Sequence, residues 1–138
     1  MATKDNIAVI EHFMQIMENG KLAEVDQLIA SNWVNHDPTL PPMQGLEGAR
    51  QLANLFHSAF SNIKVIYEDT VGEGDKVAIR FRFTGLNTGA FLTMPATDKK
   101  VDVIATGIFK VVNGKLTDNW VNLDSLGMMQ QLGFVPKP

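Results

Sequence analysis

The chain has 138 residues, of which 45% are hydrophobic and 20% are charged, and its formal net charge is −3. This length suits one folded unit with a substantial core, so residues 1–138 are expected to form a single domain. The weak negative charge gives nucleic acid no electrostatic reason to bind, and the absence of cysteine excludes disulfides and thiolate chemistry. No stretch approaches the roughly 18 apolar residues of a membrane span, and no secretory signal is evident. A cytoplasmic protein with neither nucleic-acid nor membrane partners is therefore expected.

The first half of the chain predicts three helices. Over residues 6–19, apolar side chains recur at the i, i+3, i+4, i+7 spacing of an amphipathic helix. A second apolar set over residues 22–29 predicts a short helix that packs against the first. The prolines and glycines of residues 33–48 predict a loop, and helical spacing returns over residues 49–60.

From residue 63 the hydrophobic period changes from helical to alternating, which indicates strands. Strands are expected over residues 63–71, 77–84, 100–112 and 115–124, and a short closing helix over residues 125–132. Gly107 is interpreted as the site of a bulge. Three helices followed by an antiparallel meander predict an α+β fold in which helices cover the concave face of one curved antiparallel sheet.

The last predicted strand carries polar side chains in an unusual phase. Asp118, Asn122 and Asp124 alternate in step with Trp120. Because an indole brings more apolar area than any other side chain in this strand, Trp120 is expected to face inward. Alternation then sends Asn122 and Asp124 into the space between sheet and helices, while Asp118 lies nearer the turn and is expected to be solvated or at an entrance.

Two interpretations of Asp124 remain open from the pattern alone. A carboxylate in an apolar interior costs several kcal/mol unless it is paired, hydrated or protonated, so its presence there would indicate a functional cavity. Asp124 also directly precedes the closing helix, where an aspartate is a good N-cap.

A second polar cluster, Asn35-His36-Asp37, follows Trp33. His36 is the natural partner of a carboxylate because imidazole titrates near neutral pH, although a histidine in this setting can also simply stabilise a turn. No set of His, Asp and Glu residues has the spacing of a metal site, and no glycine-rich phosphate loop precedes a helix. No metal or cofactor is therefore expected.

Several large apolar residues fall on the predicted outer face of the sheet. They are Ile66, Ile104, Ile108, Val121 and Leu123. Apolar groups gathered on an outer face indicate a partner surface, so a homodimer packed sheet to sheet is expected.

The order of elements and five segments together resemble the SnoaL-like polyketide cyclases, also called ester cyclases, of the nuclear-transport-factor-like superfamily. The segments are WVNHDP (33–38), GLEGAR (45–50), EGDKVAIRFRFTGLNTGAF (73–91), PATDKKV (95–101) and GKLTDNWVNLD (114–124). The resemblance implies a cone-shaped α+β barrel that encloses an apolar pocket, usually in a homodimer. It also implies ring closure of a hydrophobic aromatic polyketide ester by intramolecular aldol condensation, without metal or cofactor.

The resemblance also implies a site. In the family, an aspartate in a Trp-x-x-x-Asp arrangement at the end of the last strand serves as general acid/base, and this position matches Asp124. The histidine of the loop after the second helix matches His36. The candidate catalytic residues are thus Asp124 and His36, and the candidate substrate-binding residues are Trp33, Asn35, Phe56, Tyr67, Trp120 and Asn122.

This sequence departs from the family pattern at Asn87, where many relatives carry histidine, and at Asp98, where they carry glycine. A different substrate preference would follow if that histidine binds substrate in the relatives. Three alternatives remain beside the cyclase. A ketosteroid-isomerase-like enzyme would use Tyr67, and an epoxide hydrolase would need an inward arginine, whereas Arg80 and Arg82 are expected to face outward. The third is a dimeric module that binds a small hydrophobic molecule without catalysis.

Overall fold

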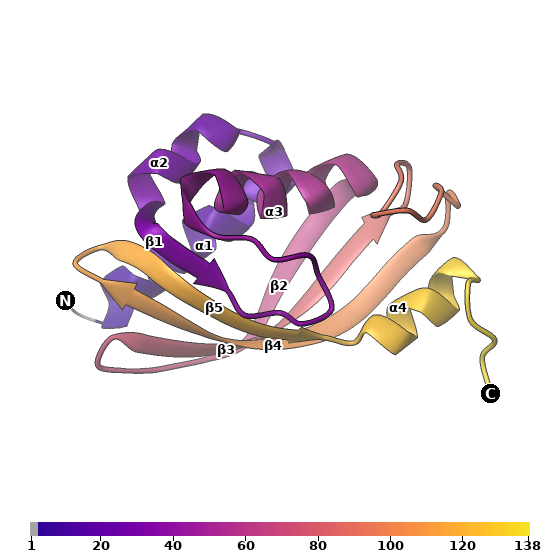
Figure 1. Cartoon of the computed structure of the whole chain (residues 1–138). Helices are drawn as coiled ribbons and strands as arrows, with labels where there is room; N and C mark the ends of the chain where they lie inside the picture. The colour runs from indigo at the N-terminus through magenta and orange to yellow at the C-terminus, as the bar shows by residue number, and fades with distance from the viewer. Residues whose placement is uncertain (1–2) are drawn as a thin grey trace.

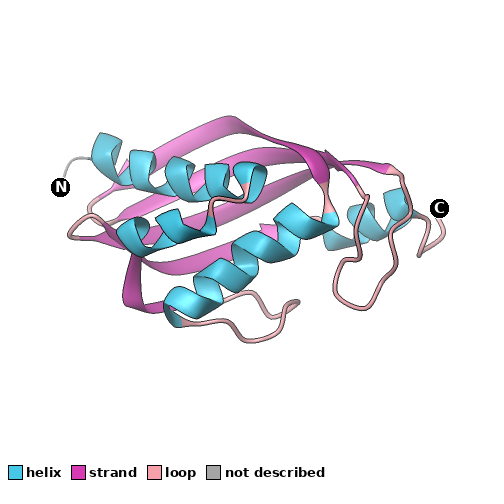
Figure 2. Ribbon diagram, turned by 90° about the horizontal axis from the view of Figure 1, so that it is seen from above, coloured by secondary structure: helices cyan, strands magenta, loops and turns pink. Residues whose placement is uncertain are grey.

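The computed structural model describes residues 3–138. Its helices and strands, in chain order, are α1 (Thr3–Asn19), the 3₁₀ helix η1 (Leu22–Glu24), α2 (Val25–Leu28), β1 (Ile29–Asn35), α3 (Gly45–Ala59), β2 (Ser61–Glu73), β3 (Lys76–Leu86), β4 (Lys100–Val112), β5 (Lys115–Leu123) and α4 (Ser125–Leu132). Figure 1 shows one curved sheet with α1, α2 and α3 over its concave face and α4 beyond one end. Seen from above in Figure 2, α1 and α3 run across this face. The α+β class and the placement of the helices on the concave face are thus confirmed. None of the described helices is long and apolar enough to cross a membrane.

The sheet is mixed, with the strand order β1-β5-β4-β3-β2. Strands β2 to β5 form the antiparallel meander that the alternating pattern predicts. Strand β1 pairs in parallel with β5 at the edge of the sheet, so the prediction of a purely antiparallel sheet is wrong. The parallel edge strand places the end of β1 beside the middle of β5, where the polar residues of the cavity lie.

The sequence predicts a helix and then a loop where β1 lies. Ile29 and Trp33, its buried residues, are four positions apart, which is also the spacing of a helix face. The strand is irregular, because its register with β5 shifts between Ile29 and Val34. Neither an alternating pattern nor a continuous apolar run therefore marks this strand in the sequence.

Two helices differ in detail from their predicted limits. Helix α3 begins at Gly45 instead of after Gly48. Gly48 lies inside the helix, and glycine is needed there because a β-carbon would lie 2.9 Å from the Met43 backbone. Helix α4 spans residues 125–132, as predicted, and ends at Gly133, whose φ of +86° suits glycine.

The interior lies between the concave face and helices α1 and α3. Strand β3 presents Val77, Ile79, Phe81 and Phe83 to it, and all four are buried as predicted. Arg80 and Arg82 alternate with them and face outward, where they form ion pairs with acidic residues of neighbouring strands. The period of two therefore identifies the faces correctly where strand pairing is regular.

A β-bulge changes the faces of β5. Val111 pairs with Leu116, whereas the preceding residue of β4, Lys110, pairs with Asp118. Thr117 is therefore an extra residue that has no partner in β4. Because a bulge shifts the alternation by one position, the inner face continues from Leu116 to Asn119.

This shift overturns the predicted orientation of the last strand. Val121 and Leu123 line the interior, whereas Asn122 and Trp120 lie on the outer face, with Trp120 36% exposed. The inward orientation predicted for Trp120, Asn122 and Asp124 is wrong, and so is the outward orientation predicted for Val121 and Leu123. The large apolar area of the indole does not turn Trp120 inward, because the His36 ring stacks on it on the outer face.

The sheet has a further bulge that the sequence did not predict, in β2, and lacks the one predicted at Gly107. The register of β2 with β3 shifts between Tyr67 and Asp69, which turns Asp69 and Val71 outward. The bulge predicted at Gly107 is absent, since Gly107 pairs regularly with both neighbouring strands. Glycine is needed there for space, because a β-carbon would lie 2.9 Å from the Phe109 ring.

Candidate functional site

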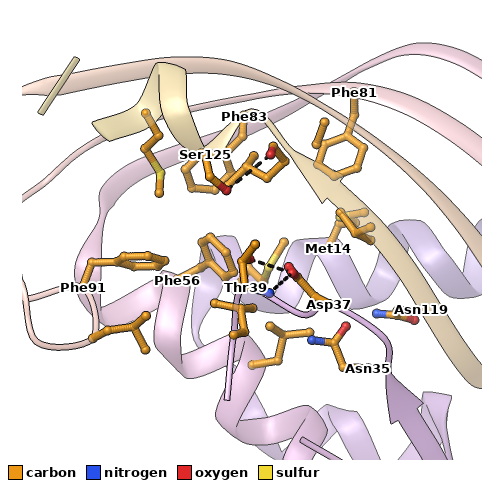
Figure 3. Close-up of a pocket in the computed structure, with 18 of the residues that line it drawn as sticks. Met14, Asn35, Asp37, Thr39, Phe56, Phe81, Phe83, Phe91, Asn119 and Ser125 are labelled. Atoms are coloured by element: carbon orange, nitrogen blue, oxygen red, sulfur yellow. Dashed lines mark hydrogen bonds between the residues drawn. The ribbon is translucent and has the colours of Figure 1, made fainter. Parts of the chain in front are cut away.

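A cavity of about 240 Å³ lies between the concave face of the sheet, the helices and the loops that follow β1 and β3 (Figure 3). Seventeen of its lining residues are apolar: Phe13, Met14, Met17, Leu40, Leu52, Phe56, Phe81, Phe83, Phe91, Leu92, Met94, Ala105, Phe109, Val121, Leu123, Met128 and Met129. Sites for drug-sized ligands span roughly 300–1,000 Å³, so this cavity suits a compact hydrophobic molecule.

Phenylalanine rings form one wall of the cavity. The Phe56 ring centroid lies 5.6 Å from that of Phe83 and 5.6 Å from that of Phe91. Phe60 packs behind both, at 5.3 and 5.9 Å. Interlocked aromatic rings of this kind hold one another in place. Phe56, a candidate substrate-binding residue from the sequence, thus lines the cavity.

Asn119 brings a buried amide to the cavity from the inner face of β5. Its Oδ1 accepts a hydrogen bond of 3.2 Å from Nε1 of Trp33, which is fully buried and packs at a tilt against Phe13. Within residues 3–138, Nδ2 of Asn119 has no hydrogen-bond partner, and in Figure 3 it points toward the side where Asn35 and Asp37 lie. Trp33 does not line the cavity, and its role is to orient Asn119 as a donor.

Asp37 is the one titratable side chain among the residues that line the cavity. Its Oδ1 accepts hydrogen bonds from the backbone N–H of Thr39 at 2.9 Å and from Oγ1 of Thr39 at 2.6 Å. Within the described part of the chain, Oδ2 has no partner. Asn35 lines the cavity two residues earlier and stands beside Asn119 in the β1–β5 register. The polar wall thus joins one carboxylate to two amides.

The sequence interpretation missed Asp37 because it selected His36 from the same cluster. Once residues 29–35 are recognised as a strand, alternation puts Trp33, Asn35 and Asp37 on one side and His36 on the other. Because no local pattern marks β1, this alternation becomes visible only once the pairing of β1 with β5 is known.

His36 lies outside the cavity, on the outer side of the sheet. Its Nε2 is 2.8 Å from Oδ2 of Asp118, and its ring stacks on Trp120 with centroids 4.7 Å apart. Partial burial raises the pKa of Asp118, but hydrogen bonds from His36 and Thr117 and the nearby charges of His36 and Lys110 outweigh burial and lower that pKa below its usual value. Asp118 is thus a partly exposed partner of His36 on the outer face and does not line the cavity.

Asp124 is exposed and caps α4. Its Oδ1 accepts a 2.9 Å hydrogen bond from the backbone N–H of Gly127. A β-carbon at position 127 would overlap this carboxylate, so the glycine makes room for the cap. Asp124 does not line the cavity and does not meet His36. Of the two interpretations of Asp124, the helix cap is the one that this geometry supports.

Tyr67 also lies away from the cavity. It packs on the inner face of β2 against the core, and burial, together with the carboxylates of Glu11 and Glu18, raises its pKa. Of the eight predicted site residues, Asn35 and Phe56 line the cavity and Trp33 supports it from behind. The other five, His36, Tyr67, Trp120, Asn122 and Asp124, do not line it.

No group of three or more His, Asp or Glu side chains within residues 3–138 is placed to hold a metal ion. The polar residues of the cavity are Asn35, Asp37, Thr39, Asn119 and Ser125. This set offers one carboxylate, two amides and two hydroxyl groups, which can accept, donate or transfer a proton.

Residues 7–132 match the family model of the SnoaL-like polyketide cyclases. No curated protein matches the sequence. Among solved structures, TsrD from Streptomyces laurentii is 26% identical over 98% of this chain and 99% of that one, with a TM-score of 0.87. A candidate polyketide cyclase from Bacillus cereus ATCC 10987 is 31% identical over 98% of this chain and 87% of that one, with a TM-score of 0.78.

A candidate SnoaL-like polyketide cyclase from Jannaschia sp. CCS1 shares the fold, with a TM-score of 0.84 at 20% identity over 96% of this chain and 94% of that one. The family match covers most of the sequence, and these structures have the same cone-shaped α+β fold. The chain therefore belongs to the SnoaL-like polyketide cyclase family.

Proposed function

We propose that this protein is a cofactor-independent enzyme that transfers a proton at a carbon atom next to a carbonyl group of a compact hydrophobic substrate. Ring closure by intramolecular aldol condensation is the specific reaction. One observation carries the proposal: in a cavity lined mostly by apolar side chains, Asp37 is the one titratable lining residue, and the amides of Asn35 and Asn119 lie in the same wall. Family membership supports the same class of chemistry.

The proposed reaction begins with Asp37 as general base. Its Oδ2 takes a proton from the carbon between two carbonyl groups, and the electrons of the broken C–H bond move into an enolate. Nδ2 of Asn119 donates a hydrogen bond to the enolate oxygen, since donors fixed in a dry site stabilise developing charge. The enolate carbon then forms a C–C bond to a third, remote carbonyl of the same molecule, and Asp37 returns its proton to the alkoxide oxygen that results. Thr39 holds the carboxylate throughout.

The proposal assigns the base to Asp37 in place of the family-derived choice of Asp124. Asp124 and His36 lie outside the cavity, so neither can touch a substrate bound there in this geometry. A ketosteroid-isomerase-like mechanism has less support, because Tyr67 is not among the lining residues. An epoxide hydrolase has less support as well, because no arginine lines the cavity.

Isotope exchange tests the proposal without knowledge of the natural substrate. A small aryl 3-oxo ester is incubated in D₂O with the protein, and loss of its proton between the carbonyl groups is followed by NMR. We expect faster exchange than in buffer containing an unrelated protein at the same concentration. Equal rates across a set of such esters would reject proton transfer and favour the module that binds a small molecule without catalysis.

We also propose that a second copy of the chain covers the outer face of the sheet. Ile66, Ile108 and Trp120 are between 36% and 46% exposed there. Several charges near them are paired within the chain, as in the Arg80–Asp69 and Arg82–Asp102 bridges, and the Lys76 ammonium lies 6.0 Å from the centroid of the Trp120 ring. An apolar surface with internally balanced charge suits an identical partner related by a two-fold axis.

Sedimentation tests this assembly. At micromolar concentration we expect twice the 15.2 kDa mass of one chain. Ile108→Lys is expected to give a monomer because it would bury an unpaired charge in the interface. Leu126→Lys, on the exposed side of α4, is the control and should leave the dimer intact. A wild-type protein that sediments as a monomer contradicts the proposal.

A further inference from the structure

The loop that joins β3 to β4, residues 87–99, is fastened at its base by one buried side chain. Nδ2 of Asn87 donates to the carbonyl oxygens of Ala59, at 3.0 Å, and Gly89, at 2.9 Å. Its Oδ1 accepts from the backbone N–H and from Oγ1 of Thr97, both at 2.9 Å. Ala59 is the last residue of α3, so this amide ties both arms of the loop to the end of that helix.

Close packing adds to this attachment. The backbone N–H of Gly89 donates to the carbonyl of Ala59 at 3.1 Å, and a β-carbon at Gly89 would overlap the carbonyl oxygen of Ser58. The backbone of Asn87 is also bonded across the loop, donating to Lys99 and accepting from Asp98, both at 2.9 Å. The base of the loop is therefore held by side-chain and backbone contacts together.

The tip of the loop is a tight turn. Phe91 and Met94 exchange two backbone hydrogen bonds of 2.9 Å, which places Leu92 and Thr93 at the corner. Leu92 has a φ of +54°, a conformation that leucine rarely adopts, and the residue is 42% exposed although it lines the cavity. A residue that touches both cavity and solvent lies at the boundary between them.

The loop stands across the cavity from the polar wall. In Figure 3, Phe91 lies on the opposite side from Asn35, Asp37 and Asn119, with Phe56 between them. A substrate whose carbonyl group is held by Asn119 therefore extends its apolar part toward Phe91 and Leu92. Since Asn87 and the turn fix these side chains, the loop acts as a rigid wall.

We propose that residues 87–99 set the length of the substrate that the cavity accepts, and that Leu92 is the specificity-determining residue. The inference rests on the proposed function only in placing the carbonyl group at Asn119. Asn87 is a positioning residue in this loop and does not line the cavity. A shorter side chain at position 92 lengthens the accessible space, and a bulkier one shortens it.

Binding of phenyl n-alkyl ketones tests the inference independently of catalysis. A series from the methyl to the heptyl ketone displaces a neutral fluorophore, N-phenyl-1-naphthylamine, from the wild-type protein. We expect the affinity for the ketone to rise by about fourfold per methylene until the alkyl chain of the ketone meets the loop, and then to stop rising. In Leu92→Ala the rise should continue for at least one more methylene, and in Leu92→Phe it should stop earlier.

Leu126→Ala is the matched control, because Leu126 is 61% exposed on α4 and does not line the cavity. In this variant, affinity should stop rising at the same alkyl length as in the wild-type protein. An unchanged limit in both Leu92 variants, or failure of every ketone to bind, would overturn the inference. If the Leu92 variants change the limiting alkyl length but the protein does not catalyse isotope exchange, the inference stands and only the proposed catalysis is rejected.

Discussion

Asp37→Asn is expected to reduce protein-catalysed isotope exchange by about 10²–10⁴-fold, the usual contribution of a general base. An amide cannot take a proton from carbon at neutral pH. Its oxygen can still accept the two hydrogen bonds from Thr39 that the aspartate accepts through Oδ1, so the loop after β1 should keep its conformation. The measurement is the NMR exchange rate at a fixed substrate concentration, corrected for the rate in buffer.

Asp124→Asn provides the control for this experiment. Asparagine is as good a helix cap as aspartate, so α4 should remain folded, and the side chain lies outside the cavity. We expect exchange within about twofold of the wild-type rate, a difference that corresponds to less than ~0.5 kcal/mol. Loss of exchange in Asp124→Asn with retention in Asp37→Asn would reverse the assignment and restore the aspartate that the family pattern indicates.

Trp33→Ala should lower the free energy of unfolding by about 3–5 kcal/mol, as expected for removal of a large core side chain. The indole is fully buried and touches Phe13, and its Nε1 is the donor to Oδ1 of Asn119. Truncation therefore leaves both a void and a buried acceptor without a partner, which adds to the loss. Urea unfolding followed by far-ultraviolet circular dichroism measures the change.

The other tryptophan, Trp120, is the matched comparison. Its ring lies on the outer face, where it stacks on His36 and is 36% exposed. We expect Trp120→Ala to cost about 1 kcal/mol in the unfolding of one chain, the scale of an exposed aromatic pair. The comparison is made at a protein concentration at which sedimentation gives the mass of a single chain. Equal losses for the two variants would contradict the orientations of β1 and β5.

The regular helices and strands were predictable because their apolar spacing depends only on residues close together in the sequence. The helical spacing of α1, the alternation of β3 and β4, and the limits of α4 all agree with the structure. The family segments then gave the correct family and fold class. Strand β1 was not predictable in this way, because its two buried residues have helical spacing and its pairing partner, β5, follows about 80 residues later.

The site itself depended on the register of the sheet. One extra residue at Thr117 reverses the faces of the rest of β5, which moves Asn119 inward and Trp120 outward. Alternation along a strand can be read from the sequence, but an interruption is decided by hydrogen bonds to the neighbouring strand. The same register brings Asn35 beside Asn119, and no local pattern connects those two residues.

The sequence by itself therefore determined that this protein has an α+β fold of the SnoaL-like family, with helices on one face of a curved sheet. Periodicity and composition suffice for the fold class, because they report which face of each regular element is apolar, and the resemblance of the five segments supplied the family. Only the tertiary structure decided that Asp37 faces the cavity and that Asp124 caps a helix. The position of Asp37 follows from the parallel pairing of β1 with β5, which lie far apart in the chain, and the outward position of Asp124 follows from the bulge in β5, which no local pattern marks.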